Sequence, residues 1–312
     1  MSFLRRLKPA YALYNVFQRH RLAHNATLYR QLGLAKSYFS PISSRDFAHL
    51  PAAGLGPAPA PLPQRLAATP AFSQLPPATQ ASLLGFEQQG FAVLPGFLTP
   101  VAVDALNAEL AALITSGQLQ FKYRNKLMFA FRQSPLVRQV AYDPQLLALL
   151  SALLGHEAQL FQSINFVTGS EQRTHSDSIH MSTYPLGGLI AAWVALDDIT
   201  LENGPLHYFP GSHKLPYYLN ADYDNEGSRW LIGDKDYSAY EAFIDQRVRE
   251  LGLQKQIFLA RKGDIFIWHA NLLHGGEAHL NKDLTRRSMV LHYFSPDHIC
   301  YHEITQRPAL LG

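Results

Sequence analysis

The apolar residues of this 312-residue chain gather in short runs separated by turn-forming residues. From residue 158 onward the runs are four to eleven residues long and rich in Ile, Val, Phe and Tyr, which is typical of β-strands. Gly-Gly, Gly-Pro and Pro-Gly pairs between them predict tight turns. We expect strands at 91–94, 158–168, 189–196, 206–209, 257–260, 264–268 and 287–294.

Two segments show helical spacing instead. Thr99 caps the first, which has Pro100 in its first turn and apolar residues at helical intervals up to Leu113. The second covers 143–154 and ends at Gly155. Many short strands with few regular helices between them predict a mainly β fold with flanking helices, either an antiparallel sandwich or a jelly roll.

Composition divides the chain into three parts. Residues 1–50 form a basic extension with helical patterns, and residues 51–80 contain eight prolines, which predicts an extended connector without regular helix. Residues 81–312 form the jelly-roll domain. Within it, the tyrosine-rich insertion 214–256 carries a capping-box pattern at 238–241 that predicts a helix. Connections of this length are typical of functional lids.

Charge is uneven along the chain. Residues 1–45 contain eight Lys and Arg and no Asp or Glu, which leaves nineteen basic against twenty-four acidic side chains in the remainder. This mildly acidic main domain argues against nucleic-acid binding. The basic segment can make a weak peripheral contact with an anionic membrane, or it can pack on the main domain.

The sequence shows neither a membrane-spanning pattern nor a signal-peptide pattern. No apolar run reaches the roughly 18 residues of a membrane-spanning helix, and Pro9 with several polar residues interrupts any signal-peptide pattern. The single cysteine, Cys300, excludes an internal disulfide. We therefore expect a cytoplasmic protein without a transmembrane segment.

Three residues have the types and spacing of a metal site. His175 and Asp177 are two apart, so on a strand they face the same side. The run 263–276 then brings His274 to two glycines, which are expected to leave space for a cofactor. Two imidazoles and one carboxylate leave three positions of an octahedron open, which favours Fe(II) and O₂ chemistry over Mg²⁺ or Ca²⁺.

An arginine follows the second half of this site. Arg286 precedes a strand in which Arg286, Ser288, Val290 and His292 share one face, whereas Arg287 takes the other. An inward-pointing arginine without a partner costs roughly 3–5 kcal/mol. A dicarboxylate cosubstrate held by the guanidinium would remove this cost. A structural ion pair with Asp or Glu is the alternative.

The segment from 175 to 213, HSDSIHMSTYPLGGLIAAWVALDDITLENGPLHYFPGSH, resembles the phytanoyl-CoA dioxygenase family. The likeness covers about residues 85–300, and it is specific because several motifs recur in the right order. The matching motifs are His175-x-Asp177, Trp193-Val-Ala-Leu-Asp197, Asn203-Gly204-Pro205-Leu206, Pro210-Gly211-Ser212-His213, Leu273-His274-Gly275 and the Arg286 strand.

The resemblance implies a double-stranded β-helix (cupin-like) fold with Fe(II), and with 2-oxoglutarate bound through its C1 carboxylate and keto oxygen. It also implies that Arg286 holds the distal carboxylate, with Ser288 as a helper. Gln162, on the strand before the metal motif, is a further candidate contact to the cosubstrate. Related halogenases lack the carboxylate ligand. Because Asp177 is present, we expect O₂-dependent hydroxylation of an unactivated C–H bond in a small-molecule or lipid-like substrate.

Other residues and functions are weaker candidates. His180 has the opposite strand parity and is expected to pack or face solvent, His269 is a rival ligand, His292 is expected to support the ligands, and Trp193 is expected in the core. No residue beyond the metal centre is predicted to be catalytic. A metal-binding jelly roll without redox chemistry, such as a cupin-like isomerase or a carbohydrate-binding module, remains an alternative, as does a tethered scaffold with a vestigial site.

Overall fold

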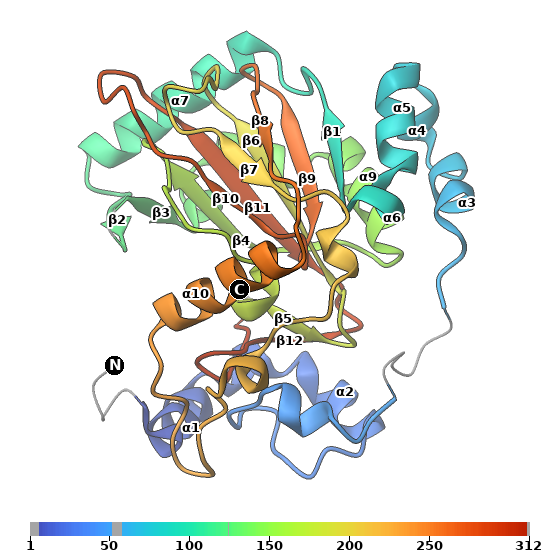
Figure 1. Ribbon diagram of the computed structural model, residues 1–312, viewed down its shortest axis with the longest axis vertical. Helices are drawn as coiled ribbons and strands as arrows, with labels where there is room; N and C mark the ends of the chain where they lie inside the picture. The colour runs from blue at the N-terminus through green and yellow to red at the C-terminus, as the bar shows by residue number, and fades with distance from the viewer. Residues whose placement is uncertain (1–5, 52–57, 124, 311–312) are drawn as a thin grey trace.

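The computed structural model describes residues 6–51, 58–123 and 125–310, and Figure 1 shows its sheets, helices and N-terminal segment. The α-helices are α1 Lys8–Phe17, α2 Asn25–Gln31, α3 Leu62–Ala67, α4 Pro70–Ser73, α5 Pro77–Leu84, α6 Phe86–Gln89, α7 Pro100–Thr115, α8 Pro135–Ala141, α9 Pro144–Leu154 and α10 Tyr237–Glu250. The strands are β1 Phe91–Leu94, β2 Phe121–Lys122, β3 Lys126–Met128, β4 Gln159–Phe166, β5 Ser182–Tyr184, β6 Leu189–Ala195, β7 Leu206–Tyr208, β8 Gln256–Phe258, β9 Ile265–His269, β10 His274–Gly276, β11 Ser288–Phe294, β12 Ile299–His302 and β13 Arg307–Pro308.

The strands form one large and two small sheets, and all their pairings are antiparallel. The large sheet has the order β1-β9-β6-β11-β4-β3-β2. The small sheet β10-β7-β8 packs across it, and the small sheet β13-β12-β5 lies at its lower end in Figure 1. Antiparallel strands that return to the same sheet from distant parts of the chain build the jelly roll that the sequence predicts.

The large sheet separates two cores, and β6 shows how. Ile190, Ala192 and Val194 point to the face that α3, α5, α7 and α9 cover. Ala191 and Trp193 point to the opposite face, where they pack with aromatic residues of β7 and β9. Because β6 is buried on both faces, its sequence is apolar throughout instead of alternating.

The seven predicted strands are present, with ends shifted by at most two residues. Six further strands, β2, β3, β5, β10, β12 and β13, have two to four residues each. Elements this short contain too few positions for an apolar period to be recognised, so only their partners reveal them. The predicted helices after Thr99 and Asp143 are α7 and α9, and both residues cap through their side chains.

Residues 62–84 are mostly helical, and for them the prediction of an extended connector is wrong. α3, α4 and α5 each have a proline in the first turn. Proline fits there because the first N–H groups of a helix have no intrahelical acceptor. Leu62, Leu66 and Leu83 are buried in the core between these helices and the sheet. Residues 52–57 lie outside the described part, so the boundaries 1–50, 51–80 and 81–312 stay predictions.

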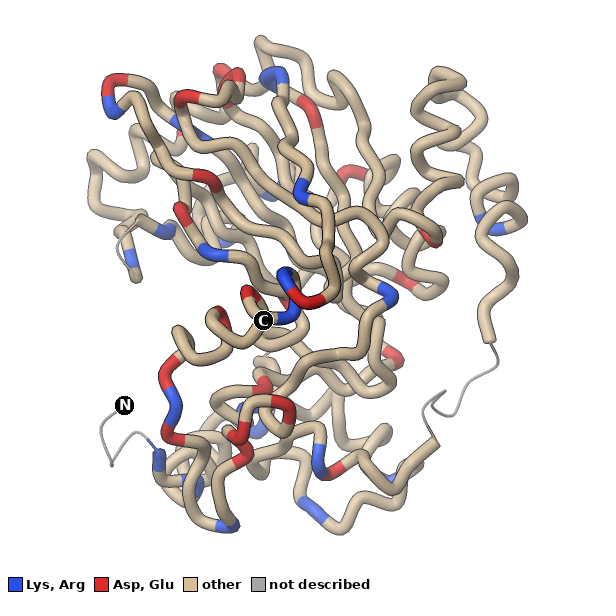
Figure 2. The backbone as a smooth tube through the Cα atoms, in the orientation of Figure 1, with Lys and Arg blue, Asp and Glu red and all other residues tan. Residues whose placement is uncertain are grey.

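Residues 6–51, here called the N-terminal arm, pack on the small sheet β13-β12-β5. Tyr29, Ile42 and Phe47 of the arm share one apolar cluster with side chains of β5 and β12. Arg6 and Arg45 pair with acidic residues of the insertion at 3.7 and 3.2 Å. Figure 2 shows basic and acidic residues interspersed in this region, so tertiary contacts balance the charge asymmetry of the sequence.

Within the described ranges, no helix combines the length and the hydropathy needed to cross a membrane.

The insertion 214–256 folds back over the metal motif. Its helix α10 begins at Tyr237, so Asp236 occupies the N-cap position and the predicted cap at Ser238 is wrong. Tyr240 and Ile244 of α10 are fully buried against a cluster that includes Ile179 and Leu273, which neighbour the predicted ligands. The insertion is therefore a packed part of the domain.

Candidate metal centre and adjoining cavity

The structure brings His175, Asp177 and His274 together, although 97 residues separate the last two. His175 and His274 form an isolated antiparallel bridge, with both backbone N–H···O distances at 2.9 Å. Asp177 begins the 3₁₀ helix η5 (Asp177–Ile179). The expectation that His175 and Asp177 share one strand face is thus wrong. His274 lies on a strand, as expected, but its two glycines belong to that strand and not to a turn. That histidine begins β10 after a turn.

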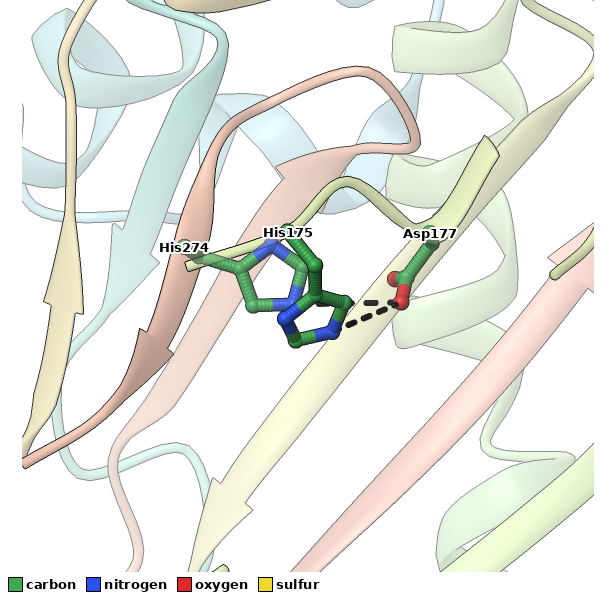
Figure 3. Close-up of side chains that lie close together, drawn as sticks. All are labelled: His175, Asp177 and His274. Carbon is green, nitrogen blue, oxygen red and sulfur yellow. Dashed lines mark ion pairs between the residues drawn. The ribbon is translucent and has the colours of Figure 1, made fainter. Parts of the chain in front are cut away.

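Figure 3 shows the two imidazoles and the carboxylate pointing toward one another. Nε2 of His175 and Nε2 of His274 each lie 3.8 Å from Oδ1 of Asp177. The Nδ1 atoms lie 2.9 Å from the carbonyl oxygens of Arg173 and Leu272. A carbonyl can only accept, so each ring proton is on Nδ1 and both Nε2 atoms are unprotonated; that of His175 also accepts the side-chain amide of Gln172 at 3.2 Å. This donor set fits Fe(II).

Oδ2 of Asp177, the carboxylate oxygen that faces away from the two imidazoles, lies next to Trp268 and His292. The indole N–H of Trp268 donates to Oδ2 at 2.7 Å, and Nε2 of His292 lies 3.5 Å from the same oxygen. Burial by itself would raise the pKa of Asp177, but His274, His292 and His175 outweigh burial and hold this pKa well below its usual value. Burial, together with His274, lowers the pKa of His175 to about 3. An ionised carboxylate and a neutral imidazole are the states in which these groups bind metals.

The two glycines after the second histidine ligand allow a close approach of protein segments. A Cβ atom at Gly275 would lie 2.6 Å from the carbonyl oxygen of Gln172, and one at Gly276 would lie 2.6 Å from Oγ of Ser170. Protein atoms therefore fill the space on the side where a Cβ would point, whereas His274 and Gly275 both line the cavity of about 480 Å³, so the expected space beside this ligand is present.

Arg286 is only 2% exposed, and it lines the same cavity as the three ligand residues. Its Nε donates to the carbonyl oxygen of Gly204 at 3.0 Å, and Nη1 donates to Oγ of Ser288 at 2.7 Å. The guanidinium lies 4.9 Å from the ring centre of Trp193. Burial lowers the pKa of Arg286 to about 10, so the cation persists at neutral pH. Over the described residues no carboxylate pairs with it, which favours an anionic ligand over the structural ion pair.

The neighbouring Arg287 faces the opposite side, as strand alternation predicts. Its guanidinium pairs with Asp197 at 2.6 Å, and the same carboxylate accepts the hydroxyl of Thr285 at 2.8 Å. Asp197 therefore fixes the chain on both sides of Arg286 and leaves the latter directed at the cavity.

The cavity beside the candidate ligands has a volume of about 480 Å³. Gln162 lies in its wall, opposite His292 in the register of β4 and β11. Ser288 reaches the site through its bond to Arg286. The large sheet also contributes Lys126 and a set of apolar side chains to the wall, namely Met128, Ile164, Phe166, Trp193, Trp268 and Val290.

Several cavity residues escape sequence reasoning. His180 lines the cavity, with its ring 6.2 Å from that of His175, because no strand exists there for the parity argument to apply. Lys126, His302 and Thr305 also line it. They lie on or beside very short strands and belong to no recognised motif, so nothing in the sequence indicates them.

The rival ligand His269 lies elsewhere. Its ring is 5.5 Å from that of His213, and both border a separate cavity of about 240 Å³. Ser212, in the same Pro-Gly-Ser-His motif, accepts the N–H of Leu273 at 2.9 Å and so fixes the residue before the His274 ligand.

Comparison with known proteins agrees with this geometry. The sequence pattern of the phytanoyl-CoA dioxygenase (PhyH) family matches residues 86–288, more than half of the chain. This chain belongs to the phytanoyl-CoA dioxygenase family. The matched segment contains all three candidate metal ligands and Arg286.

Relatives in this family are distant. A phytanoyl-CoA dioxygenase domain-containing protein 1 of Mus musculus is 25% identical over 178 residues, 54% of this chain and little more than half (56%) of the mouse protein. The ectoine dioxygenase of Halomonas elongata is 26% identical over 260 residues, 76% of each chain.

Solved structures share the fold. A non-heme alpha-ketoglutarate-dependent carbocyclase from nogalamycin biosynthesis superposes with a TM-score of 0.59 at 18% identity, covering 73% of this chain and 87% of that one. EctD from S. alaskensis with bound Fe gives 0.53 at 19% identity, covering 69% and 76%. At these identities the superpositions establish the double-stranded β-helix and leave the substrate open.

Proposed function

We propose that this protein is an Fe(II)- and 2-oxoglutarate-dependent dioxygenase that hydroxylates an unactivated C–H bond of a small-molecule substrate. One observation carries the proposal. Two imidazole Nε2 atoms and a carboxylate oxygen converge on the same cavity that Arg286 lines, a buried arginine for which the described part of the chain offers no carboxylate partner. The two imidazoles and the carboxylate suit a ferrous ion, and the guanidinium of Arg286 suits the distal carboxylate of a diacid. A metal-binding jelly roll without redox chemistry needs the three metal ligands but not the buried arginine.

His175, Asp177 and His274 would hold the metal. When bound, Fe(II) with O₂ and 2-oxoglutarate supplies the oxidising power for C–H hydroxylation, with succinate and CO₂ as coproducts. Trp268 and His292 fix the outer oxygen of Asp177, so the inner oxygen keeps its direction toward the two imidazoles.

Arg286 would bind the distal carboxylate of 2-oxoglutarate, with Ser288 orienting the guanidinium and Gln162 adding a polar contact. The planar face of Trp193 against Arg286 limits the guanidinium to one orientation. With its Nε bonded to Gly204, the outer nitrogens are the groups available to a carboxylate.

Helix α10 of the insertion would keep water from the metal. The Tyr240 hydroxyl lies 3.3 Å from the backbone N of Ser176, and Tyr237 lies 3.3 Å from Gln172, which in turn contacts His175 at 3.2 Å. Through these contacts α10 packs against the backs of the segments that carry His175 and Asp177, and a dry site limits side reactions of the oxidant.

Succinate release tests the proposal directly. The purified protein is supplied with Fe(II), 2-oxoglutarate and O₂ against a panel of metabolites, beside His175→Ala, Asp177→Ala and Arg286→Ala. We expect each of these three variants to lose turnover, whereas His269→Asn, which changes a histidine outside the cavity, retains it. Retained turnover in any of the first three, or undiminished activity with Zn²⁺ in place of iron, would reject the assignment.

The proposal includes a weak membrane contact through the N-terminal arm. Helix α1 exposes Leu13, Tyr14 and Phe17 to solvent at 61%, 45% and 72%, and its one fully buried residue is Asn15. Exposed apolar side chains on a basic segment suit an anionic lipid surface. Sedimentation with phosphatidylglycerol vesicles should carry down the wild type more than Phe17→Ser. Equal sedimentation of both proteins would contradict the contact.

A further inference from the structure

One wall of the cavity carries three polar side chains that neither the metal nor the cosubstrate uses. His302 ends β12, Thr305 lies in the following turn, and His180 follows η5. These residues belong to the small sheet β13-β12-β5 and to the segment after the metal motif. Arg286 and Gln162 instead come from the large sheet, which lies above the small one in Figure 1.

Several hydrogen-bonding groups of this wall have no partner among the described residues. Nδ1 of His302 accepts the N–H of Thr305 at 3.3 Å, so the ring proton is on Nε2, which bonds no described residue. Oγ1 of Thr305 is buried and likewise without a partner. The ring of His180 lies 5.4 Å from that of His302 and 4.6 Å from that of Tyr237, and its nitrogens bond no other described side chain. Buried polar atoms nearly always have partners, so a free group beside a cavity indicates a ligand.

The wall is held rigidly from behind by Glu303, which is fully buried. Its carboxylate accepts the backbone N–H and the hydroxyl of Ser44 at 3.0 and 2.7 Å, and its backbone carbonyl accepts the side-chain amide of Asn220 at 2.7 Å. The N-terminal arm and the insertion therefore both clamp the residue between His302 and Thr305. Side chains fixed in this way suit specific recognition.

We propose that His180, His302 and Thr305 form the substrate-recognition site of the proposed dioxygenase and bind an oxygen-rich part of the substrate, with hydroxyl or carboxylate groups, opposite the carbon that reacts. This inference rests on the proposed function and names the class of molecule that the same cavity accepts. The three residues act by binding and orienting the substrate.

The chemistry of the wall selects this class. Burial lowers the pKa of His302 to about 4, so this ring is neutral at pH 7. Because Nδ1 of His302 already accepts the N–H of Thr305, this ring offers the N–H of Nε2 as a donor, and the hydroxyl of Thr305 offers a donor and an acceptor. Together they match paired oxygens and not a hydrocarbon chain. Lys126, which lines the same cavity, disfavours a cationic group.

The volume selects a small molecule. Ligand sites span about 300–1,000 Å³, and this cavity of about 480 Å³ must also hold the cosubstrate. A long acyl chain therefore fits neither the space nor the polarity of this wall.

The test uses the full chain loaded with Fe(II) and 2-oxoglutarate without O₂. Calorimetry measures the affinities of methyl α-D-glucopyranoside, D-gluconate and 1-octanol for the wild type, Thr305→Val, His302→Phe and the matched control Thr305→Ser, which keeps the hydroxyl. We expect at least one oxygen-rich probe to bind the wild type and Thr305→Ser, and to bind Thr305→Val and His302→Phe about tenfold more weakly, the loss of one hydrogen bond.

Three outcomes overturn the inference: octanol as the only probe that binds, no binding of either oxygen-rich probe, or equal affinity of the bound probe for all four proteins. The affinity for 2-oxoglutarate, measured on the same variants, should not change. Failure of the wild type itself to bind 2-oxoglutarate would refute the proposed function instead. In that case the difference in probe affinity between the wild type and Thr305→Val still tests the recognition site.

Discussion

Removing the indole N–H of Trp268 should weaken iron binding without removing any ligand. Trp268→Phe keeps an aromatic ring against the imidazole of His274, from which it lies 4.5 Å by ring centres. It deletes the 2.7 Å hydrogen bond to Oδ2 of Asp177. A hydrogen bond to a charged group contributes roughly 1.5–3 kcal/mol, which corresponds to roughly 10- to 150-fold in affinity. His292, at 3.5 Å from the same oxygen, is too distant to replace the bond.

Anaerobic titration with Fe(II) measures this effect, and the chain provides a matched control. Trp193 is equally buried, but it lies against Arg286 and belongs to the cosubstrate side. Trp193→Phe should therefore leave the Fe(II) affinity unchanged and weaken the binding of 2-oxoglutarate by a few fold, because a cation–π contact contributes on the order of 0.5–2 kcal/mol. Trp268→Phe should therefore lose Fe(II) affinity, whereas Trp193→Phe should lose 2-oxoglutarate affinity.

The reasoning is refuted if Trp268→Phe binds Fe(II) as tightly as the wild type, or if both tryptophan variants lose the same metal affinity. The first result would mean that Asp177 keeps its orientation without the indole. The second would mean that general loosening of the core, and not the specific bond, controls the site. Thermal unfolding of both variants distinguishes a local from a global effect.

Three further predictions concern the cosubstrate arginine, its support and the buried histidines. Arg286→Lys keeps the charge but loses the planar fork, so calorimetry should show 2-oxoglutarate binding weakened by at least tenfold with Fe(II) affinity intact; equal affinity would contradict a two-point contact. Asp197→Ala frees the half-exposed Arg287 and should cost about 1–2 kcal/mol of unfolding free energy by urea denaturation; an unchanged urea midpoint would mean that this pair is not structural. Burial lowers the pKa of His269 and His298 from 6.5 to about 4, so between these values the unfolded chain binds protons that the folded chain does not. The contribution of these neutral histidines to the free energy of unfolding should be fully present above about pH 6.5 and decline as the pH falls toward 4. The decline should be smaller in His269→Asn. A urea midpoint that does not fall between pH 7.5 and 5.5 would contradict this.

Local chemistry explains why parts of the site can be predicted from sequence. The three ligand types and Arg286 are recognisable because a metal and a diacid each need particular donors, and those residues sit in motifs of fixed spacing. The alternation that separates Arg286 from Arg287 is a property of any strand, and the structure has Arg287 paired with Asp197 on the other face. The expected strand geometry holds for His274, which starts a short strand, and fails for Asp177, which lies at the start of a 3₁₀ helix.

The sequence by itself determined the major strands, the two flanking helices and the residue types of the metal site, since each depends on neighbours within a few positions. Only the tertiary structure decided which residues line the cavity beyond these motifs. His180, His302 and Thr305 come together because the N-terminal arm and the insertion clamp Glu303. Helices α3 and α5 bury Leu62, Leu66 and Leu83 against the sheet. Such contacts join residues far apart in the chain, and no local pattern encodes them, because their free energy arises only when both partners are already in place.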